Sequence, residues 1–229
     1  MSVEAPAIDP ELEIIRPVLD RATQIIDEEY GPEGRQPLDY HNVDHTLAAV
    51  YDTIKLADLA IKRGNLDPRR KKPLLVGMGF HDTKQGLGPG NNERASIDLA
   101  DQIMIEEGGY SQEDRDYVGD VISGTVNLAP EGRVRQAARD SADYGVRLAA
   151  DADLAPSGKP WDIYWKNFKR LAVELWPDKD VEGRDFAEFA PGQIYLLRQG
   201  FLTAEAEELF PHREENARHL EAMLKQLDG

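Results

Sequence analysis

Apolar residues recur at helical spacing through almost the whole chain, and this periodicity is the feature that most limits the fold. In the segment 14–26, for example, apolar positions lie three, four and seven residues apart, so they share one face of a helix. No segment alternates convincingly with a period of two, the pattern of a half-buried strand. The sequence therefore predicts an all-α fold, a compact bundle of about eight helices.

Glycine and proline residues divide this pattern into segments. No Pro/Gly/Ser-rich linker separates one part of the chain from another, and no internal repeat or low-complexity tract stands out, so we expect residues 1–229 to form a single domain. The expected helical segments are 10–30, 43–63, 73–82, 91–107, 111–125, 134–154, 161–176, 191–201 and 203–227, the last interrupted by Pro211.

Composition and charge exclude several classes of function. The 27 basic and 43 acidic residues give a formal net charge of −16, which would repel the phosphates of duplex DNA or RNA. We expect no membrane association, because no apolar run approaches spanning length. The N-terminus shows no secretory signal and the chain has no cysteine, so we expect a cytoplasmic protein in which any metal is held by His, Asp or Glu.

The segment from Pro73 to Asp82 is apolar nearly all round and then ends in His81 and Asp82. A helix of this kind is typically buried on most sides. Burying a carboxylate without a partner costs several kcal/mol, so Asp82 requires a metal ion or a cationic group beside it. The plainer interpretation is that His81 and Asp82 are polar core residues whose hydrogen bonds are satisfied by neighbouring protein groups.

Three of the five histidines in the chain are concentrated in the stretch 40–82. His41 and His45 are four residues apart and would share one face of a helix, and His81 stands next to Asp82. Imidazole nitrogen and carboxylate oxygen suit borderline and harder divalent ions, so the pattern predicts a metal site. A further carboxylate, Asp151 or Asp153, would complete four protein ligands.

These residues resemble the H…HD…D motif of HD-domain metal-dependent phosphohydrolases, and the likeness covers roughly residues 38–220. The surrounding Tyr40-His-Asn-x-x-His-Thr, Phe80-His-Asp, Asn92-Glu-x-x-Ser96 and Asp151-Ala-Asp-Leu are similar to small stand-alone bacterial proteins of that superfamily. The resemblance implies an HD core at about 38–155, with an N-terminal helix and C-terminal helices packed on it. It also implies His45, His81, Asp82 and Asp153 as metal ligands, with Asp151 left to cap a turn or to bond a ligating imidazole.

The resemblance further suggests catalytic parts. His41 would protonate the leaving group, since the first histidine of a Tyr-His-Asn-x-x-His pattern does so in cyclic nucleotide phosphodiesterases; otherwise it only orients a neighbour. Lys84 would hold a phosphate oxygen, or is a solvated loop lysine. Glu93 would assist proton transfer with Asp82, or only complements a helix dipole. Arg94 would contact phosphate, although one guanidinium on an exposed helix is usually solvated.

No histidine occurs between His81 and His212, whereas two-metal members of the superfamily need extra ligands in that interval. We therefore expect one divalent ion per chain, Mn, Mg, Fe, Co or Zn, and a phosphoric ester hydrolase that uses a metal-bound water on a small phosphorylated metabolite or nucleotide. The alternatives are a metal- and ligand-binding HD protein with little turnover and, third, an HD-type oxygenase. Assembly into a homo-oligomer is left open.

Overall fold

The computed structural model describes residues 10–128 and 135–227. Their secondary structure is ten α-helices, a few 3-10 turns and one ladder of two-residue strands, which confirms the all-α prediction with two helices more than expected. The first six helices are α1 (Pro10–Tyr30), α2 (Val43–Arg63), α3 (Lys71–Phe80), α4 (Asn91–Glu107), α5 (Gln112–Gly124) and α6 (Tyr144–Asp153). The remaining four are α7 (Trp161–Leu175), α8 (Phe186–Arg198), α9 (Ala204–Leu209) and α10 (Arg213–Leu227).

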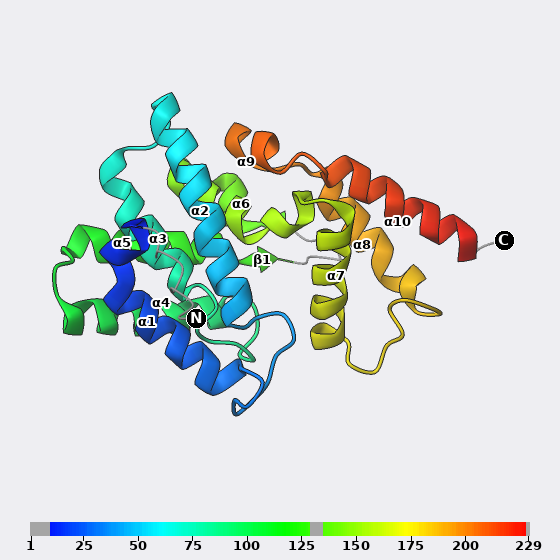
Figure 1. Ribbon diagram of the computed structural model, residues 1–229, viewed down its shortest axis with the longest axis horizontal. Coiled ribbons are helices and arrows are strands. Elements are labelled where there is room, and N and C mark those ends of the chain that lie inside the picture. The colour runs from blue at the N-terminus through cyan, green and yellow to red at the C-terminus, as the bar shows by residue number, and fades with distance from the viewer. Residues whose placement is uncertain (1–9, 129–134, 228–229) are drawn as a thin grey trace, which may run out of the picture.

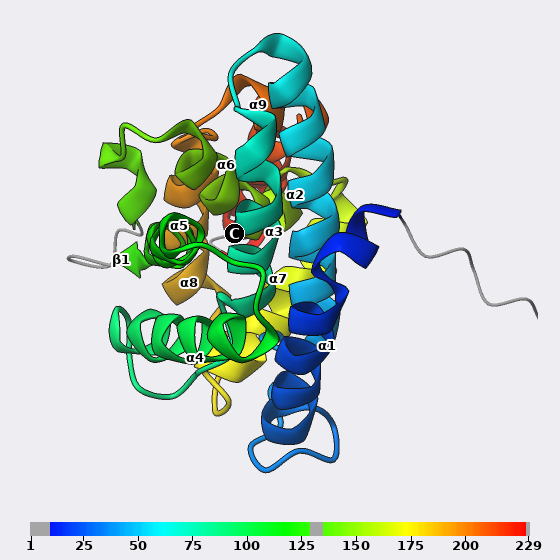
Figure 2. The same ribbon diagram turned by 90° about the vertical axis from the view of Figure 1, so that its left-hand side faces the viewer.

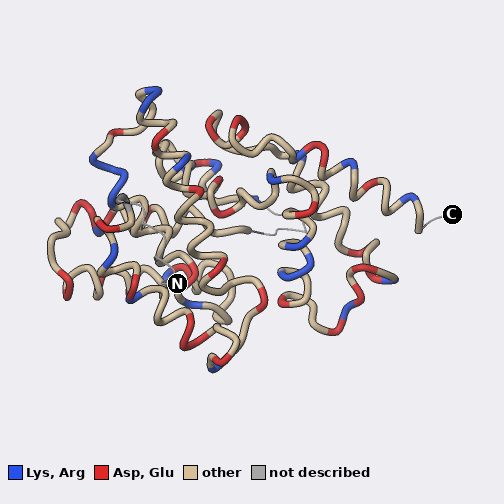
Figure 3. The backbone as a smooth tube through the Cα atoms, viewed as in Figure 1, with Lys and Arg blue, Asp and Glu red and all other residues tan. Residues whose placement is uncertain are grey.

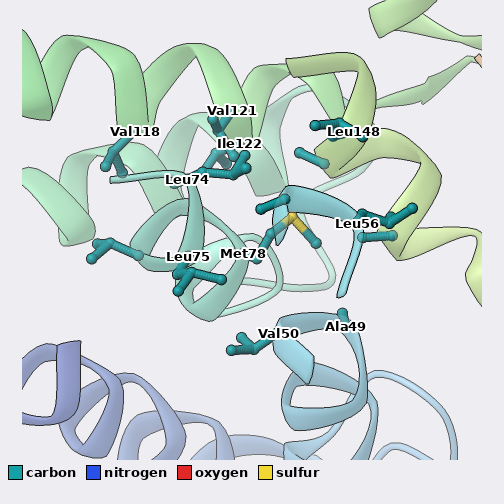
Figure 4. Close-up of a cluster of buried hydrophobic side chains, with 14 of the residues drawn as sticks. Ala49, Val50, Leu56, Leu74, Leu75, Met78, Val118, Val121, Ile122 and Leu148 are labelled. Carbon is teal, nitrogen blue, oxygen red and sulfur yellow. The ribbon is translucent and has the colours of Figure 1, made fainter. Parts of the chain in front are cut away.

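Helix α3 lies at the centre of the larger group of helices and contacts α1, α2, α4, α5 and α6 (Figure 2). Its apolar side chains, among them Leu74 and Met78, are fully buried and meet side chains of α2, α5 and α6 in one core (Figure 4). Gly77 allows α5 to approach closely, since a Cβ there would lie 2.8 Å from Cβ of Val121. The element that carries His81 and Asp82 at its end is therefore held from all sides.

Caps define where the helices around the site begin and end. Asn42 precedes α2 and its side chain accepts a hydrogen bond from the amide of Asp44, while Gly64 closes the helix with φ +76°. Ser111 and Asp114 form a capping box at the start of α5, as the sequence predicts. Because Asn42 is the cap, His41 lies before α2 and not on the same helix as His45.

The expected helix 134–154 is much shorter in the structure. Residues Arg135–Gln136 form a strand, β2, that pairs with β1 (Asn127–Leu128), and a 3-10 turn at Ala137–Asp140 follows. Helix α6 then begins after Asp143, whose carboxylate accepts a hydrogen bond from the amide of Val146 at 3.1 Å. Short polar side chains such as Asp and Ser compete with helical hydrogen bonds, which explains why the helix starts so late.

The C-terminal segments also differ in their bounds. Helix α8 begins at Phe186 and includes Pro191, whereas the glycine- and proline-based division placed its start at Pro191 and its end at Phe201. The predicted interruption at Pro211 is present and separates α9 from α10. Thr203 caps α9 through a hydrogen bond that its hydroxyl accepts from Ala206.

Buried side chains form two hydrophobic clusters. The larger belongs to α1 to α6 and α9, and the smaller belongs to α7, α8 and α10, which stand to one side in Figure 1. Polar bonds tie the segment between α6 and α7 to both groups of helices. Lys159 pairs with the buried carboxylate of Asp52 at 2.5 Å, and the amide of Asn216 donates to the carbonyl of Ser157 at 3.0 Å.

Acidic residues are distributed over both groups of helices, with basic residues interspersed among them (Figure 3). The one run of four basic residues, 69–72, is largely paired: Arg69 with Asp67, Arg70 with Glu113 and Lys71 with Asp58, while the ammonium of Lys72 lies 4.0 Å from the ring centre of Tyr110. Among the described helices, none is long and apolar enough to cross a membrane.

Candidate metal centre

The ends of three helices bring the four predicted ligands together. His45 lies in the first turn of α2, His81 and Asp82 directly follow α3, and Asp153 is the last residue of α6. Their ligand atoms all lie within 4.8 Å of one another. In the part of the chain that the structure describes, this is the one group of three or more such side chains that could hold a metal ion.

Both imidazoles present Nε2 to the two carboxylates. His45 Nε2 lies 3.1 Å from Asp82 Oδ2 and 3.2 Å from Asp153 Oδ1. The corresponding distances from His81 Nε2 are 3.0 and 3.4 Å, and the two nitrogens are 3.3 Å apart. These five separations lie between 3.0 and 3.4 Å, and all four ligand atoms lie within 4.8 Å of one another.

The separations that involve the imidazole nitrogens fit a coordination sphere. With ligand bonds of about 2.0–2.1 Å, neighbouring ligand atoms lie about 3.3 Å apart in a tetrahedral site and about 3.0 Å apart in an octahedral one. The observed separations of 3.0–3.4 Å fall in this range. Two nitrogens and two anionic oxygens could therefore hold one ion with little movement of the side chains.

Hydrogen bonds around the cluster leave Nε2 of His81 and Oδ2 of Asp82 available to bind a metal ion. The Nδ1–H of His81 donates to the carbonyl of Met78 at 2.7 Å; since a carbonyl only accepts, neutral His81 keeps the lone pair on Nε2. Gln85 donates to Asp82 Oδ1 at 2.9 Å and in turn accepts from Asn92 at 3.1 Å. Asp82 Oδ2, the oxygen that faces both imidazoles, is buried and has no hydrogen-bond partner.

An oxygen without a partner in such a place supports a cation there, because buried polar atoms are otherwise almost always paired. The imidazoles of His45 and His81 are 4% and 1% exposed, and the carboxylates of Asp82 and Asp153 are 13% exposed. The carboxylates thus form the side of the cluster that solvent can reach.

The charges within the cluster stabilise each other. Burial raises the pKa of Asp82, but the imidazoles of His81 and His41 outweigh this effect and hold the pKa well below its usual range. Burial likewise opposes the ionisation of Asp153, but the adjacent imidazoles of His45 and His81 outweigh this effect and lower its pKa to about 2. Once both imidazoles are neutral, as metal ligands must be, the two ionised carboxylates leave the cluster with a net negative charge that suits a dication.

Asp151, the other aspartate considered for the fourth ligand, points elsewhere. It is fully buried and accepts hydrogen bonds from the amides of Leu202 and Thr203 at 2.8 Å and from the hydroxyl of Thr203 at 2.7 Å. Burial raises its pKa to about 6, although these bonds act in the opposite direction. Asp151 therefore fixes the turn before α9, which is one of the two roles considered for it from the sequence. Asp153 is the aspartate that joins the cluster.

His41 lies beside the cluster without belonging to it. Its ring is nearly perpendicular to that of His45, with 5.7 Å between ring centres, and the ring of Tyr40 lies 4.5 Å from that of His45. Burial lowers the pKa of His41, but the charge of Asp82 and a hydrogen bond to Glu174 raise it more, so the net direction is upward. Glu174 comes from α7 in the smaller group of helices.

The other three predicted residues lie on the loop after Asp82 and the start of α4. The amide of Lys84 donates to the hydroxyl of the buried Ser96 at 3.1 Å, which fixes the backbone of this loop, and its side chain is half-buried. Glu93 accepts from the amide of Gly90 at 2.6 Å and so caps α4, while Arg94 is exposed in the first turn of that helix. The catalytic parts of Lys84, Glu93 and Arg94 stay predictions.

Sequence reasoning missed two side chains that contact this site directly, Gln85 and Glu174. Gln85 had a weak signal, since it follows the His81-Asp82 pair by three residues and Asn92, its partner, belongs to a recognised motif. Glu174 had none, because 133 residues separate it from His41.

Comparison with known proteins adds no identification. A scan against models of protein families gives no match, and a search of curated proteins finds no match either.

Proposed function

We propose that this chain is an HD-type metal-dependent phosphohydrolase that acts on a small phosphate ester or nucleotide. The observation that carries the proposal is the convergence of His45, His81, Asp82 and Asp153, four residues from three separate stretches of sequence, to within 4.8 Å. Convergence of two imidazoles and two carboxylates in a mostly buried place is the arrangement expected of a metal centre and is costly for a protein without one.

A divalent ion bound by these four residues would polarise a phosphoryl oxygen and lower the pKa of a coordinated water. The protein's own side chains supply the remaining steps. Asp82 or Glu93 accepts a proton from the attacking water, and His41 gives a proton to the ester oxygen as the phosphorus–oxygen bond breaks. Lys84, with Arg94 as a further cation, neutralises charge on the phosphate.

One ion per chain is favoured over two. Each additional ion would need its own set of carboxylate or imidazole ligands, and the described part of the chain offers a single such group. This supports simple hydrolysis at one centre over the di-iron chemistry of an oxygenase.

The first test is the metal content of protein purified without chelator, measured by plasma mass spectrometry for wild type, Asp82→Ala and, as a matched control, the exposed Asp178→Ala. We expect about one equivalent in wild type and control and none in Asp82→Ala. Each of the five candidate ions is then added to a panel of small phosphate esters and nucleotides. We expect phosphate release that is lost in Asp82→Ala.

The outcomes separate the alternatives. Metal binding without release of phosphate from any ester would favour a binding protein with little turnover. No metal in any of the three proteins, even after reconstitution, would contradict the metal centre itself.

A further inference from the structure

The carboxylate of Glu174 collects three hydrogen-bond donors from the short segment in front of α2. Its Oε2 accepts from the backbone amides of Tyr40 at 2.9 Å and His41 at 3.0 Å. Its Oε1 accepts from the imidazole Nδ1 of His41. The side chain of Glu174 is only 8% exposed, so water competes little for these bonds.

The third bond determines the state of the His41 ring. An ionised carboxylate can only accept, so Nδ1 of His41 must carry a proton. Neutral His41 therefore has its lone pair on Nε2, and Nε2 is the nitrogen at which a proton is gained or lost. The same bond fixes the plane of the ring, which stands nearly perpendicular to the ring of the metal ligand His45.

Glu174 comes from a different helix and a different group of helices than the four proposed metal ligands. It lies on α7, whose buried side chains Tyr164 and Phe168 belong to the smaller hydrophobic cluster, whereas all four ligands belong to α2, α3 and α6 and the residues adjoining them. Arg170, one turn earlier on α7, donates to the carbonyl of Asp39 at 2.7 Å. One face of α7 thus holds the segment 39–41 at two points.

We propose that Glu174 is the positioning residue for His41: it keeps Nδ1 protonated and Nε2 aimed for delivery of a proton to the leaving oxygen. This inference rests on the proposed hydrolase function. In the step itself the proton passes from Nε2 to the ester oxygen as the phosphorus–oxygen bond breaks, the ring becomes neutral, and Glu174 keeps its negative charge throughout. The smaller group of helices is then part of the catalytic apparatus, although it holds no metal ligand.

Glu174→Gln separates this role from simple anchoring of the segment. The two backbone amides can only donate, so the carbonyl of the substituted side chain is expected to face them, which turns its NH₂ group toward Nδ1 of His41. An amide donor at Nδ1 requires the other tautomer, with the proton on Nε2. We expect the nitrogen-15 resonances of the His41 ring to report this exchange of tautomers, and with five histidines the ring is assigned by comparison with His41→Gln.

The kinetic test measures kcat and KM for two substrates, phenyl phosphate and p-nitrophenyl phosphate, in the presence of the ion that activates the wild type. The nitrophenolate leaves readily without a proton, and phenolate does not. We expect Glu174→Gln to lower kcat for phenyl phosphate about tenfold to hundredfold and to affect p-nitrophenyl phosphate much less, with KM and metal content unchanged. In a His41→Gln background, Glu174→Gln should have no further effect on kcat, because its partner is gone.

The exposed Glu188→Gln, on neighbouring helix α8, is the matched control and should change neither kcat nor metal content. Equal losses on the two esters, additive effects of Glu174→Gln and His41→Gln, or an unchanged His41 tautomer would each overturn the positioning role while leaving the hydrolase standing. If wild type with metal hydrolyses neither ester nor any of the phosphate panel, the hydrolase itself is overturned.

Discussion

Two aspartates on the last turn of α6 show how the surroundings of a residue determine its role in the protein. Asp151 and Asp153 are two positions apart, so their side chains leave the helix in very different directions. Asp153 meets the imidazoles of His45 and His81, whereas Asp151 meets backbone and hydroxyl donors before α9. One carboxylate is therefore available to a cation and the other serves the fold.

This difference predicts opposite effects of the same substitution. Asp151→Asn places an NH₂ group among donors and leaves buried groups unpaired, so we expect a loss of about 1–3 kcal/mol in the free energy of unfolding with metal content retained. Asp153→Asn should abolish metal binding with a smaller loss of stability. Urea unfolding and metal analysis of both variants check this. Loss of metal in Asp151→Asn and not in Asp153→Asn would reverse the assignment of the fourth ligand.

Gln85 orients Asp82, a proposed metal ligand, without belonging to the cluster of four residues. Its amide donates to Asp82 Oδ1 at 2.9 Å and so leaves Oδ2 directed at the imidazoles. Removing such a partner typically weakens metal binding about tenfold to hundredfold, and we expect this for Gln85→Ala in a titration against a competing chelator. Gln112→Ala, which removes an exposed amide bonded to Asp116, is the control. Equal affinities in the two variants would show that Asp82 needs no support from Gln85.

Sequence could predict which four residues cluster, but not the side chains that support them, for a physical reason. His45, His81 and Asp82 are recognisable because their types and order match the demands of a metal ion, and Asp153 because a motif surrounds it. A glutamate near the end of an amphipathic helix, as Glu174 is, looks like any solvated residue. Only the packing of α7 against the segment 39–41 gives it three donors, and that packing depends on contacts across more than a hundred residues.

At the scale of elements, the spacing of α3 and α5 controls the position of His81 and Asp82. A Cβ on Gly77 would lie 2.5 Å from Cγ1 of Val121, closer than packed atoms tolerate. A Cβ on Gly119, in α5, would meet its nearest neighbour, Ile97, at 3.6 Å, which is ordinary contact. The two glycines thus occupy the same kind of helix position with different surroundings.

Alanine should therefore have opposite effects at these two positions. Gly119→Ala removes backbone freedom from the unfolded chain and should stabilise the protein by about 0.5–1 kcal/mol. Gly77→Ala has the same effect on the unfolded chain, but its Cβ forces α3 and α5 apart. This overpacking costs about 1–3 kcal/mol, so we expect a net loss of stability. Thermal unfolding of both variants measures the difference. A stabilised Gly77→Ala would mean that the two helices separate easily.

The start of α9 is tied to the turn after α2 and to α6 by Glu205, which is fully buried and accepts from Asn65 at 2.9 Å and from the hydroxyl of Tyr144. Burial raises its pKa, but these hydrogen bonds bring the net value below the ordinary 4.5. A carboxyl group with a lowered pKa stabilises the fold above its unfolded pKa, and the stabilisation is lost as pH falls through the folded pKa.

Wild type should accordingly be more stable than Glu205→Gln at pH 7, and this gap should shrink as pH falls below 4.5. Urea midpoints of both proteins across that range give the measurement. The exposed Glu113→Gln serves as the comparison, with a gap expected to stay small at every pH. A gap for Glu205→Gln that is independent of pH would mean that the ionised form is not the one the fold stabilises.

Element boundaries illustrate a second limit of sequence reasoning. The periodicity over 134–154 is real in its second half, where α6 forms, but in the first half residues 135–136 pair with β1 and a 3-10 turn follows at 137–140. Pairing of this kind joins two segments through backbone hydrogen bonds and leaves little trace in side-chain periodicity. The core, by contrast, was predictable at α3, since a helix that is apolar on all sides has to be surrounded.

On the scale of the whole molecule, polar bonds connect the two groups of helices that contain the two hydrophobic clusters. Glu174 reaches the segment before α2, and Lys159 reaches Asp52, a carboxylate that is 2% exposed. Breaking a buried pair by separating its partners leaves charges without compensation, so the two groups of helices should unfold together. All three tryptophans, Trp161, Trp165 and Trp176, belong to α7 or adjoin it, so intrinsic tryptophan fluorescence reports on the smaller group alone.

This arrangement predicts that metal bound in the larger group stabilises the smaller one. A ligand at a hundredfold excess over its dissociation constant adds about 2.7 kcal/mol, which for a chain of this size raises the melting temperature by about 5–10 °C. Because Glu174 and Lys159 join the groups, the fluorescence midpoint should rise together with that of far-ultraviolet circular dichroism. Neither should move in Asp82→Ala, which lacks a ligand. A dichroism midpoint that rises alone would mean that α7, α8 and α10 unfold independently, and Glu174 would then reach His41 only while that group is folded.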